Sequence, residues 1–318
     1  MKVLLAAIAL AAPFVQEPAP EQALAVVLPS DWAVGARLSI VLEKVREKSV
    51  GHQREVVRAS RTAAELEVLA RTVDGFRVAW TWGATELEPT VAGANARLAE
   101  RLATVHAGTR LELSLDSFGS VRELLNVDEL VQRYERVLAE LDQTLAEDGM
   151  SAERRELALS AVRPLLEPEV VLATATEDAA LFLAMSGGSF APLAPVEFED
   201  SLPNPLGGPR IASRGVVELT DHDTERATIR RTLSADPRQA AISAHAAVQQ
   251  LSANAGRALT GDDAVPKLAI EDEATWTFDR ATGWPVACRH ERRTSVNDRA
   301  QVERRTFTAA PSAAGESR

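Results

Sequence analysis

Four short clusters of histidine and acidic residues are the places where this sequence could bind a metal ion. His290-Glu-Arg-Arg-Thr294 begins like the zinc motif His-Glu-x-x-His, but threonine stands where the second ligand is required. Asp221-His222-Asp223 lies in a predicted hairpin turn, where such residues are common for conformational reasons. Asp262-Asp263 and the run from Glu271 to Glu273 lack the spacing of a calcium loop. We therefore expect no metal site, and no loss of stability when a chelator is added.

Motifs for covalent or phosphate chemistry are absent from the sequence. It contains no Gly-x-Ser-x-Gly elbow, no Ser-x-x-Lys pair and no phosphate-binding or dinucleotide-binding glycine pattern. Aspartate and glutamate are abundant, so the fold could still assemble a pair of carboxylates of the kind that hydrolyses glycosides. We expect no cofactor. The sequence favours a protein that is not an enzyme, without deciding the question.

Apolar side chains at alternate positions of two predicted strands are the best candidates for ligand binding. Between Phe76 and Trp82 the large apolar residues share one strand face, and Arg77 and Thr81 fall on the other. If the sheet curves over the apolar face, these residues would line a site for an apolar ligand, with Trp80 and Trp82 on the concave side. Otherwise they fill the core. The candidate ligand-binding residues are Phe76, Val78, Trp80, Trp82, Trp276 and Phe278.

Most of the chain shows the period-two alternation of antiparallel strands. Asp74-Gly75 separates two such runs and predicts a hairpin with a type I′ turn, which requires positive φ at both residues. Asp116 to Gly119, Asp221 to Asp223 and Asn297-Asp298 predict further turns. The predicted strands lie at residues 37–43, 65–73, 76–82, 111–115, 215–219 and 225–233, around 276–278 and 286–288, and in a last run up to residue 308.

Helical patterns occur mainly in the middle of the chain. The clearest begins at the N-cap Asn126, with Glu129 in the capping-box position, and ends near Gly149. Thr174 and Glu177 predict another capping box, before a short helix over residues 179–185. Further helices are predicted at residues 92–105, at residues 151–162, and from Asp236-Pro237 to Leu251.

The fold class predicted from this order of elements is α+β. A curved, largely antiparallel sheet (an open or half barrel) packs on a helical segment between about residues 92 and 185. A single domain with two half-sheets is favoured over two independent domains. The predicted divisions are 1–25 (signal peptide and flexible lead-in), 26–191 (N-terminal half with hairpins and helices), 192–209 (Pro/Gly-rich connection), 210–308 (C-terminal antiparallel half) and 309–318 (frayed tail).

The N-terminus has the features of an export signal. Lys2 is followed by the apolar run Val3 to Ala12, which is shorter than the roughly 20 residues of a membrane span. Small residues suit cleavage at either 9–11 or 23–25, and an N-terminal strand or helix of the folded domain is the alternative. We expect an exported protein, periplasmic or extracellular, with no integral membrane span in its mature chain.

Composition restricts the partners. The formal net charge of −11 would become −12 when Lys2 is removed with the signal, so nucleic acid is not an expected partner. Hydrophobic residues make up 46% of the chain, which is enough for a core. The single cysteine, Cys288, excludes an intramolecular disulfide, and its strand position predicts a packed and inert thiol.

Two hairpins give the chain a recognisable layout. A strand ending in Asp116-x-x-Gly119-x-Val121 precedes the long helix, and after a Pro-rich crossing the chain closes with Asp279-x-x-Thr282-Gly283-x-Pro285. This layout, over about residues 32–308, resembles an uncharacterised family of secreted bacterial β-domain proteins, themselves similar to the periplasmic open-barrel lipoprotein carriers. The resemblance implies a curved sheet that wraps around helices and encloses an apolar cavity. It transfers no functional residue.

The two hairpins also resemble each other. Leu113 to Val121 and Trp276 to Val286 each contain a strand, an Asp/Gly turn and another strand, so either duplication or shared turn chemistry explains them.

The function expected is that of an exported, non-enzymatic binder of an apolar small molecule or of an envelope protein. A carboxylate-based hydrolase and a structural module of an envelope complex are the alternatives. An enclosed apolar pocket would favour the binder, and carboxylates converging in a polar cleft would favour the hydrolase. An exposed apolar patch without a pocket would favour the structural module.

Overall fold

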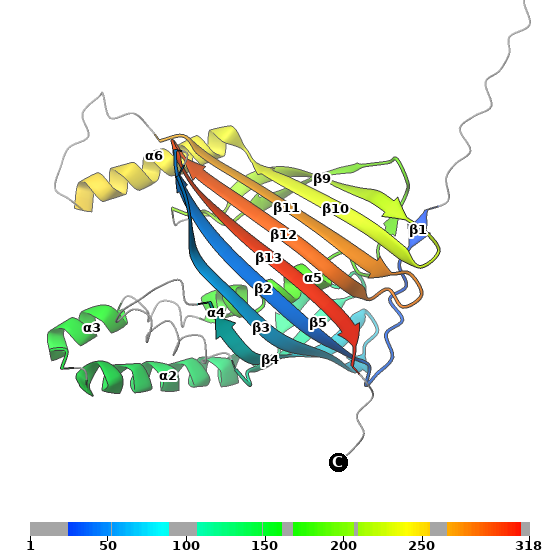
Figure 1. Ribbon diagram of the computed structural model, residues 1–318, viewed down its shortest axis with the longest axis horizontal. Helices are drawn as coiled ribbons and strands as arrows, with labels where there is room; N and C mark the ends of the chain where they lie inside the picture. The colour runs from blue at the N-terminus through cyan, green and yellow to red at the C-terminus, as the bar shows by residue number, and fades with distance from the viewer. Residues whose placement is uncertain are drawn as a thin grey trace, which may run out of the picture.

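A large antiparallel sheet dominates the computed structural model, which describes residues 25–51, 53–88, 107–147, 149–160, 168–206, 209–254 and 266–312 (Figure 1). Over these residues the sheet has eleven strands and is open, with β6 and β8 at its edges. This confirms the predicted α+β class with a curved, largely antiparallel sheet. The strand order is β6, β5, β4, β3, β2, β13, β12, β11, β10, β9 and β8.

The strands are long, and each long hairpin follows the chain. The bounds are β2 Arg37–Val50, β3 Gln53–Arg71, β4 Gly75–Leu87, β5 Arg110–Asp116, β6 Val121–Leu124, β8 Val196–Leu202, β9 Ile211–His222, β10 Arg226–Ala235, β11 Leu268–Asp279, β12 Pro285–Val296 and β13 Arg299–Pro311. A separate pair joins β1 Val26–Val27 to β7 Ser189–Phe190. The Pro/Gly-rich stretch 192–209 therefore includes the edge strand β8.

The pairing of β13 with β2 joins the two halves of the chain into one sheet. Its register runs from Arg299 opposite Val50 to Pro311 opposite Leu38. The last strand thus continues three residues past the predicted end at residue 308, because Ala309 and its neighbours still pair with β2.

The two faces of the sheet differ in polarity, as the period-two alternation requires. One face, called the inner face here, carries the buried apolar residues and packs against α4 Pro168–Ala175 and α5 Glu177–Leu183. The outer face carries Arg–Glu pairs across neighbouring strands, such as Arg37 with Glu67 at 2.9 Å and Arg304 with Glu47 at 2.8 Å. Exposed pairs of this kind add little to the stability of the fold, but they keep the outer face polar and hydrated.

The other helices lie away from the middle of the inner face. In Figure 1, α2 Val127–Glu147 and α3 Ala152–Ser160 extend beyond the sheet at the lower left, and α6 Pro237–Asn254 lies at the upper left. A second small core joins α6 to β9, β10 and β11 through Ala244, Leu233 and Ile270. None of the helices in the described ranges combines the length and the apolar character needed to cross a membrane.

Two Asp/Gly turns pack closely against other segments, one against the end of α5 and one against the segment around Pro29. Asp116 accepts the backbone N–H groups of Phe118 and Ser120, and Asp279 caps its own turn in the same way. Gly119 has φ +75° and Gly283 has φ +69°. A Cβ on Gly119 would overlap the carbonyl oxygen of Leu183 at the end of α5, and one on Gly283 would overlap the carbonyl oxygen of Pro29.

Several local predictions are wrong in detail. The hairpin at Asp74-Gly75 exists, but the turn is not type I′, because Gly75 has an extended φ of +159° and Asp74 has no positive φ. Asn126 does precede α2, yet its side chain binds β5 instead of closing a capping box. Its Oδ1 accepts the Glu112 N–H at 2.9 Å, and its Nδ2 donates to the Arg110 carbonyl at 2.9 Å. The helix start is tied to the sheet because these strand groups lie within reach.

The predicted cap at Thr174 is also wrong. Thr174 lies inside α4, where its hydroxyl donates to the Val170 carbonyl at 2.7 Å. Thr176 occupies the N-cap position of α5, without a side-chain capping bond. Residues 1–24 of the predicted signal peptide and lead-in (1–25), the predicted helix at 92–105 and Asp262-Asp263 lie outside the described residues.

Candidate functional site

The six candidate ligand-binding residues come together on one buried surface. We call it the apolar wall: it comprises Phe76, Val78, Trp80, Trp82, Trp276 and Phe278, each at most 7% exposed. β4 and β11 supply these residues, so the wall draws on both halves of the chain. Whether they contact a ligand stays a prediction.

Helix α5 covers the apolar wall. The Phe182 ring lies edge-on to Trp80, with 5.9 Å between ring centroids, and also packs against Phe307 of β13 at 5.5 Å. The Trp276 indole donates its Nε1–H to the Leu181 carbonyl at 2.8 Å. Phe182 and Leu183 are fully buried as a result. The space in front of the wall is therefore taken by side chains of the protein's own chain.

A line of basic residues crosses the inner face immediately beside the apolar residues. Arg231 pairs with Ala274, Ala274 with His290, His290 with Arg305, and Arg305 with Lys44, on five successive strands. We call Arg231, His290, Arg305 and Lys44 the basic row. Two residues further along the same strands stand Trp276, Cys288, Phe307 and Leu42, which are all buried.

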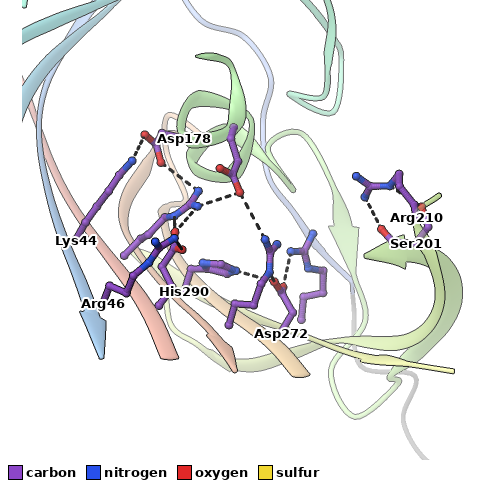
Figure 2. A network of polar contacts seen from close by, with 12 residues as sticks. Lys44, Arg46, Asp178, Ser201, Arg210, Asp272 and His290 are labelled. Carbon is purple, nitrogen blue, oxygen red and sulfur yellow. Dashed lines mark hydrogen bonds and ion pairs between the residues drawn. The ribbon is translucent and has the colours of Figure 1, made fainter. Parts of the chain in front are cut away.

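The acidic N-terminus of α5 meets the basic row. Asp178 accepts from Lys44 Nζ at 2.6 Å and from Arg305 Nη1 at 3.1 Å, and Figure 2 shows Lys44 and Asp178 pointing toward each other. Glu177 lies 2.9 Å from Arg305 Nη2 and 3.6 Å from Arg292. The Arg305 side chain is only 5% exposed. Burial acts to lower the pKa of Arg305, but the three carboxylates around it outweigh burial and raise that pKa above its ordinary value.

Asp272 is the fully buried centre of the same network. Its carboxylate accepts from His290 Nε2 at 2.8 Å, from Arg292 Nε at 2.8 Å and from Arg231 Nη2 at 3.2 Å. Burial alone would raise the pKa of Asp272, but the His290 hydrogen bond and the arginine charges hold it well below its usual range. Figure 2 shows His290 directed at Asp272.

Glu303 completes the acidic side of the network. It accepts from Arg305 at 2.5 Å and lies 3.3 Å from Arg46. Burial raises the pKa of Glu303, and the neighbouring Arg305 and Arg46 more than offset this, leaving the pKa at about 2.

Two buried polar atoms of the basic row have no hydrogen-bond partner within the described part of the chain. They are Nδ1 of His290 and Nε of Arg231. The two residues lie on either side of Ala274, which pairs with both of them and has only a methyl side chain. Buried polar groups are almost always satisfied, so each exception calls for a physical explanation.

The network has the wrong electrostatics for acid–base hydrolysis. A carboxylate hydrolase needs one carboxyl group whose pKa is raised, so that it can donate a proton near neutral pH. Asp272 and Glu303 both have lowered pKa values and stay ionised. Burial also raises the pKa of the Cys288 thiol, so it is not a nucleophile. Asp272 and Glu303 therefore do not supply the proton donor that the hydrolase alternative requires.

The structure does not bring the candidate metal ligands together among the described residues. Asp223 accepts the backbone N–H groups of Glu225 and Arg226, each at 2.7 Å, and so shapes its own turn. His290 lies on β12, where Thr294 points to the same face two repeats away. Among the described residues, no three histidine, cysteine or acidic side chains are grouped so that they could hold a metal ion.

Sequence reasoning missed the charged network, although a signal for it exists. Lys44 continues the inward alternation of Leu38, Ile40 and Leu42, and His290 follows Cys288 with the same parity. A charged residue at a position that should be buried indicates either a partner across the core or a site. The partners on α5 could not be read from the strands.

Comparison with known proteins identifies no family. No family model matches the chain, and no curated protein matches its sequence. A solved lipovitellin structure, described as showing lipid–protein interactions, aligns with a TM-score of 0.44 and 9% identity over 91% of this chain and 27% of that chain. This chain therefore spans about a quarter of the lipovitellin chain. An outer membrane channel from Pseudomonas putida F1 aligns with a TM-score of 0.15 and 7% identity over 92% of this chain and 100% of the channel. Both structural similarities are weak.

Proposed function

We propose that this protein is an exported, non-enzymatic binder of an apolar ligand, and that the ligand binds on the inner face of the sheet. One observation carries the proposal: a wall of large apolar side chains, built from both halves of the chain, is covered in part by α5, a helix of seven residues that contacts Trp80 and Trp276. In this proposal the short helix is the part of the cover that the ligand replaces. The layout shared with lipoprotein carriers is consistent with this function.

In this proposal α5 moves away from the wall as a unit. Its N-cap Thr176 makes no side-chain capping bond, and the chain turns sharply after the helix, where Met185 and Gly187 have φ of +69° and +70°. Apart from its ion pairs, the side-chain hydrogen bond from Trp276 holds it to the wall.

The apolar side chains of α5 set the requirement for a ligand. Leu181, Phe182 and Leu183 are buried against the wall, and each contributes about 1.5–3 kcal/mol through burial. A ligand that displaces them must cover comparable apolar area, as an alkyl chain or a fused ring does. A smaller or polar molecule would leave the wall exposed to water.

The test is a titration of the purified protein with N-phenyl-1-naphthylamine, a neutral apolar dye that fluoresces in dry surroundings. We expect saturable dye fluorescence and quenching of tryptophan fluorescence with the wild type. Phe182→Ala should bind the dye more tightly, because it removes the largest covering side chain. Leu157→Ala, at a position on α3 that is 73% exposed, is the control and should change nothing.

A second variant tests whether Trp80 contacts the ligand or serves only as a core residue. Trp80→Ala should weaken dye binding, and because Trp80 is fully buried it should also cost about 3–5 kcal/mol of stability. If the folded wild type binds no dye and Trp80→Ala shows the stability loss alone, the binder proposal fails. A structural module of an envelope complex would then remain.

A further inference from the structure

Helix α5 has the composition of an amphiphile with an anionic head. Glu177 and Asp178 stand at one end, and Leu181, Phe182 and Leu183 follow. The acidic end meets the basic row, and the apolar end meets the apolar wall. The inner face therefore offers the two environments, in the right order, that a single-chain anionic lipid or fatty acid would need.

Without α5, the charged network of the inner face would contain more cations than carboxylates. Five basic side chains from the sheet (Arg231, Arg292, Arg305, Lys44 and Arg46) surround two carboxylates from the sheet, those of Asp272 and Glu303. Glu177 and Asp178 reduce this excess from three positive charges to one. Arg305 is the buried cation of this group, with a side chain that is 5% exposed, and it would keep only Glu303 as an acidic partner if Glu177 and Asp178 moved away. Loss of partners around a buried charge is destabilising, so departure of α5 is favoured when another anion replaces its carboxylates.

Two nitrogen atoms of the basic row form no hydrogen bond with α5 or with any other described residue. Nδ1 of His290 is buried in a residue that is 4% exposed, and it has no hydrogen-bond partner in the described ranges. Nε of Arg231, on the other side of Ala274, is likewise unpartnered. Arginine forks suit the oxygens of carboxylate and phosphate groups, which a lysine at the end of the row complements as a point charge.

We propose that the ligand of the inner face is an anionic amphiphile, and that Arg305, Lys44 and Arg231 bind its carboxylate or phosphate head where the α5 carboxylates now lie. This inference rests on the proposed function and adds the chemistry of the head group. The Glu177–Asp178 pair then acts as a built-in competitor that keeps the site closed until an anionic head displaces it.

The test compares ligands with one chain and different heads. Decanoate, decyl phosphate and decan-1-ol are titrated against the protein loaded with the neutral dye, and inorganic phosphate and acetate are titrated alone. We expect both anionic amphiphiles to displace the dye about tenfold more strongly than decanol, as one charged hydrogen-bonded contact provides. The short anions alone should bind much more weakly than the amphiphiles.

Two pairs of variants locate the head group. Lys44→Gln should reduce the preference for decanoate over decanol severalfold. Lys48→Gln is the matched control, because Lys48 lies on the same face of β2 two repeats further from the wall and should leave the preference unchanged. Asp178→Asn should raise the affinity for decanoate severalfold by weakening the competitor. Thermal unfolding checks that each variant is folded.

Each outcome decides between the two proposals. Equal displacement by decanoate and decanol, or an unchanged preference in Lys44→Gln, overturns the head-group inference while the apolar binder stands. Inorganic phosphate binding as tightly as decyl phosphate also overturns it, because the site would then serve a free anion. Absence of binding by the dye and by all three decyl compounds, measured directly by calorimetry, ends both proposals.

Discussion

Replacing Asp272 with asparagine tests whether the buried network stabilises the fold through charge. The substitution keeps the size of the side chain and removes its charge. Asp272 is fully buried and accepts hydrogen bonds from His290, Arg292 and Arg231. In the variant, two arginines would face a neutral amide that can itself accept through only one oxygen. Removal of one member of a buried charged network costs about 3–5 kcal/mol.

The surroundings place the expected loss at the lower end of that range. The side chains of Arg231 and Arg292 are 18% and 24% exposed, so both can turn partly toward water. We expect Asp272→Asn to lower the free energy of unfolding by about 3 kcal/mol. With a denaturant slope of about 2–3 kcal/mol per molar, the urea midpoint should fall by about 1 M or more, followed by tryptophan fluorescence.

A neighbour on the same strand provides the control. Glu273 is exposed on the outer face of β11, and Glu273→Gln should change stability by no more than about 0.5 kcal/mol. A loss below about 1 kcal/mol for Asp272→Asn, or a loss equal to that of the control, would refute the reasoning.

The pH dependence gives the same test a definite sign. The pKa of Asp272 is lower in the folded protein than in the unfolded chain, where an aspartate has a pKa of about 3.9. A lowered pKa contributes stability that is present above the unfolded pKa and is lost as the pH falls toward the folded pKa. The difference between wild type and Asp272→Asn should therefore shrink below about pH 4. A difference that grows there would contradict the assignment.

Three further predictions concern other parts of the molecule. Gly283→Ala should lower the free energy of unfolding by more than Gly108→Ala does. Both residues have positive φ, but the new Cβ meets the carbonyl oxygen of Pro29 only at Gly283. Urea midpoints of the two variants measure the difference. The Cys288 thiol should react with Ellman's reagent only after urea unfolding, because burial raises its pKa and excludes the reagent; fast reaction of the folded protein would contradict this. N-terminal sequencing of protein from its native host should begin between about residues 12 and 26, and an intact Met1 on protein from the cytoplasm would disprove export.

Strand positions and turns were accessible from the sequence because they depend on neighbouring residues. The alternation from Phe76 to Trp82 places the apolar side chains on one face, as the structure confirms. The turns at Asp116 and Asp223 form because each carboxylate accepts backbone N–H groups two to four residues away. The details that failed, at Asn126 and Thr174, involve side chains that found partners on other elements or within an unpredicted helix.

The sequence by itself determined which residues point inward. Lys44, His290 and Arg305 have the same parity as the apolar residues of their strands, so period two alone assigns them to the inner face. The tertiary structure decided what they meet there. Lys44 and Arg305 reach Asp178 across 134 and 127 residues of chain, through the pairing of β13 with β2 and the placement of α5. Local patterns set the direction of a side chain, whereas the partner of a buried charge depends on the path of the whole chain, because only folding brings distant carboxylates and arginines into one low-dielectric space.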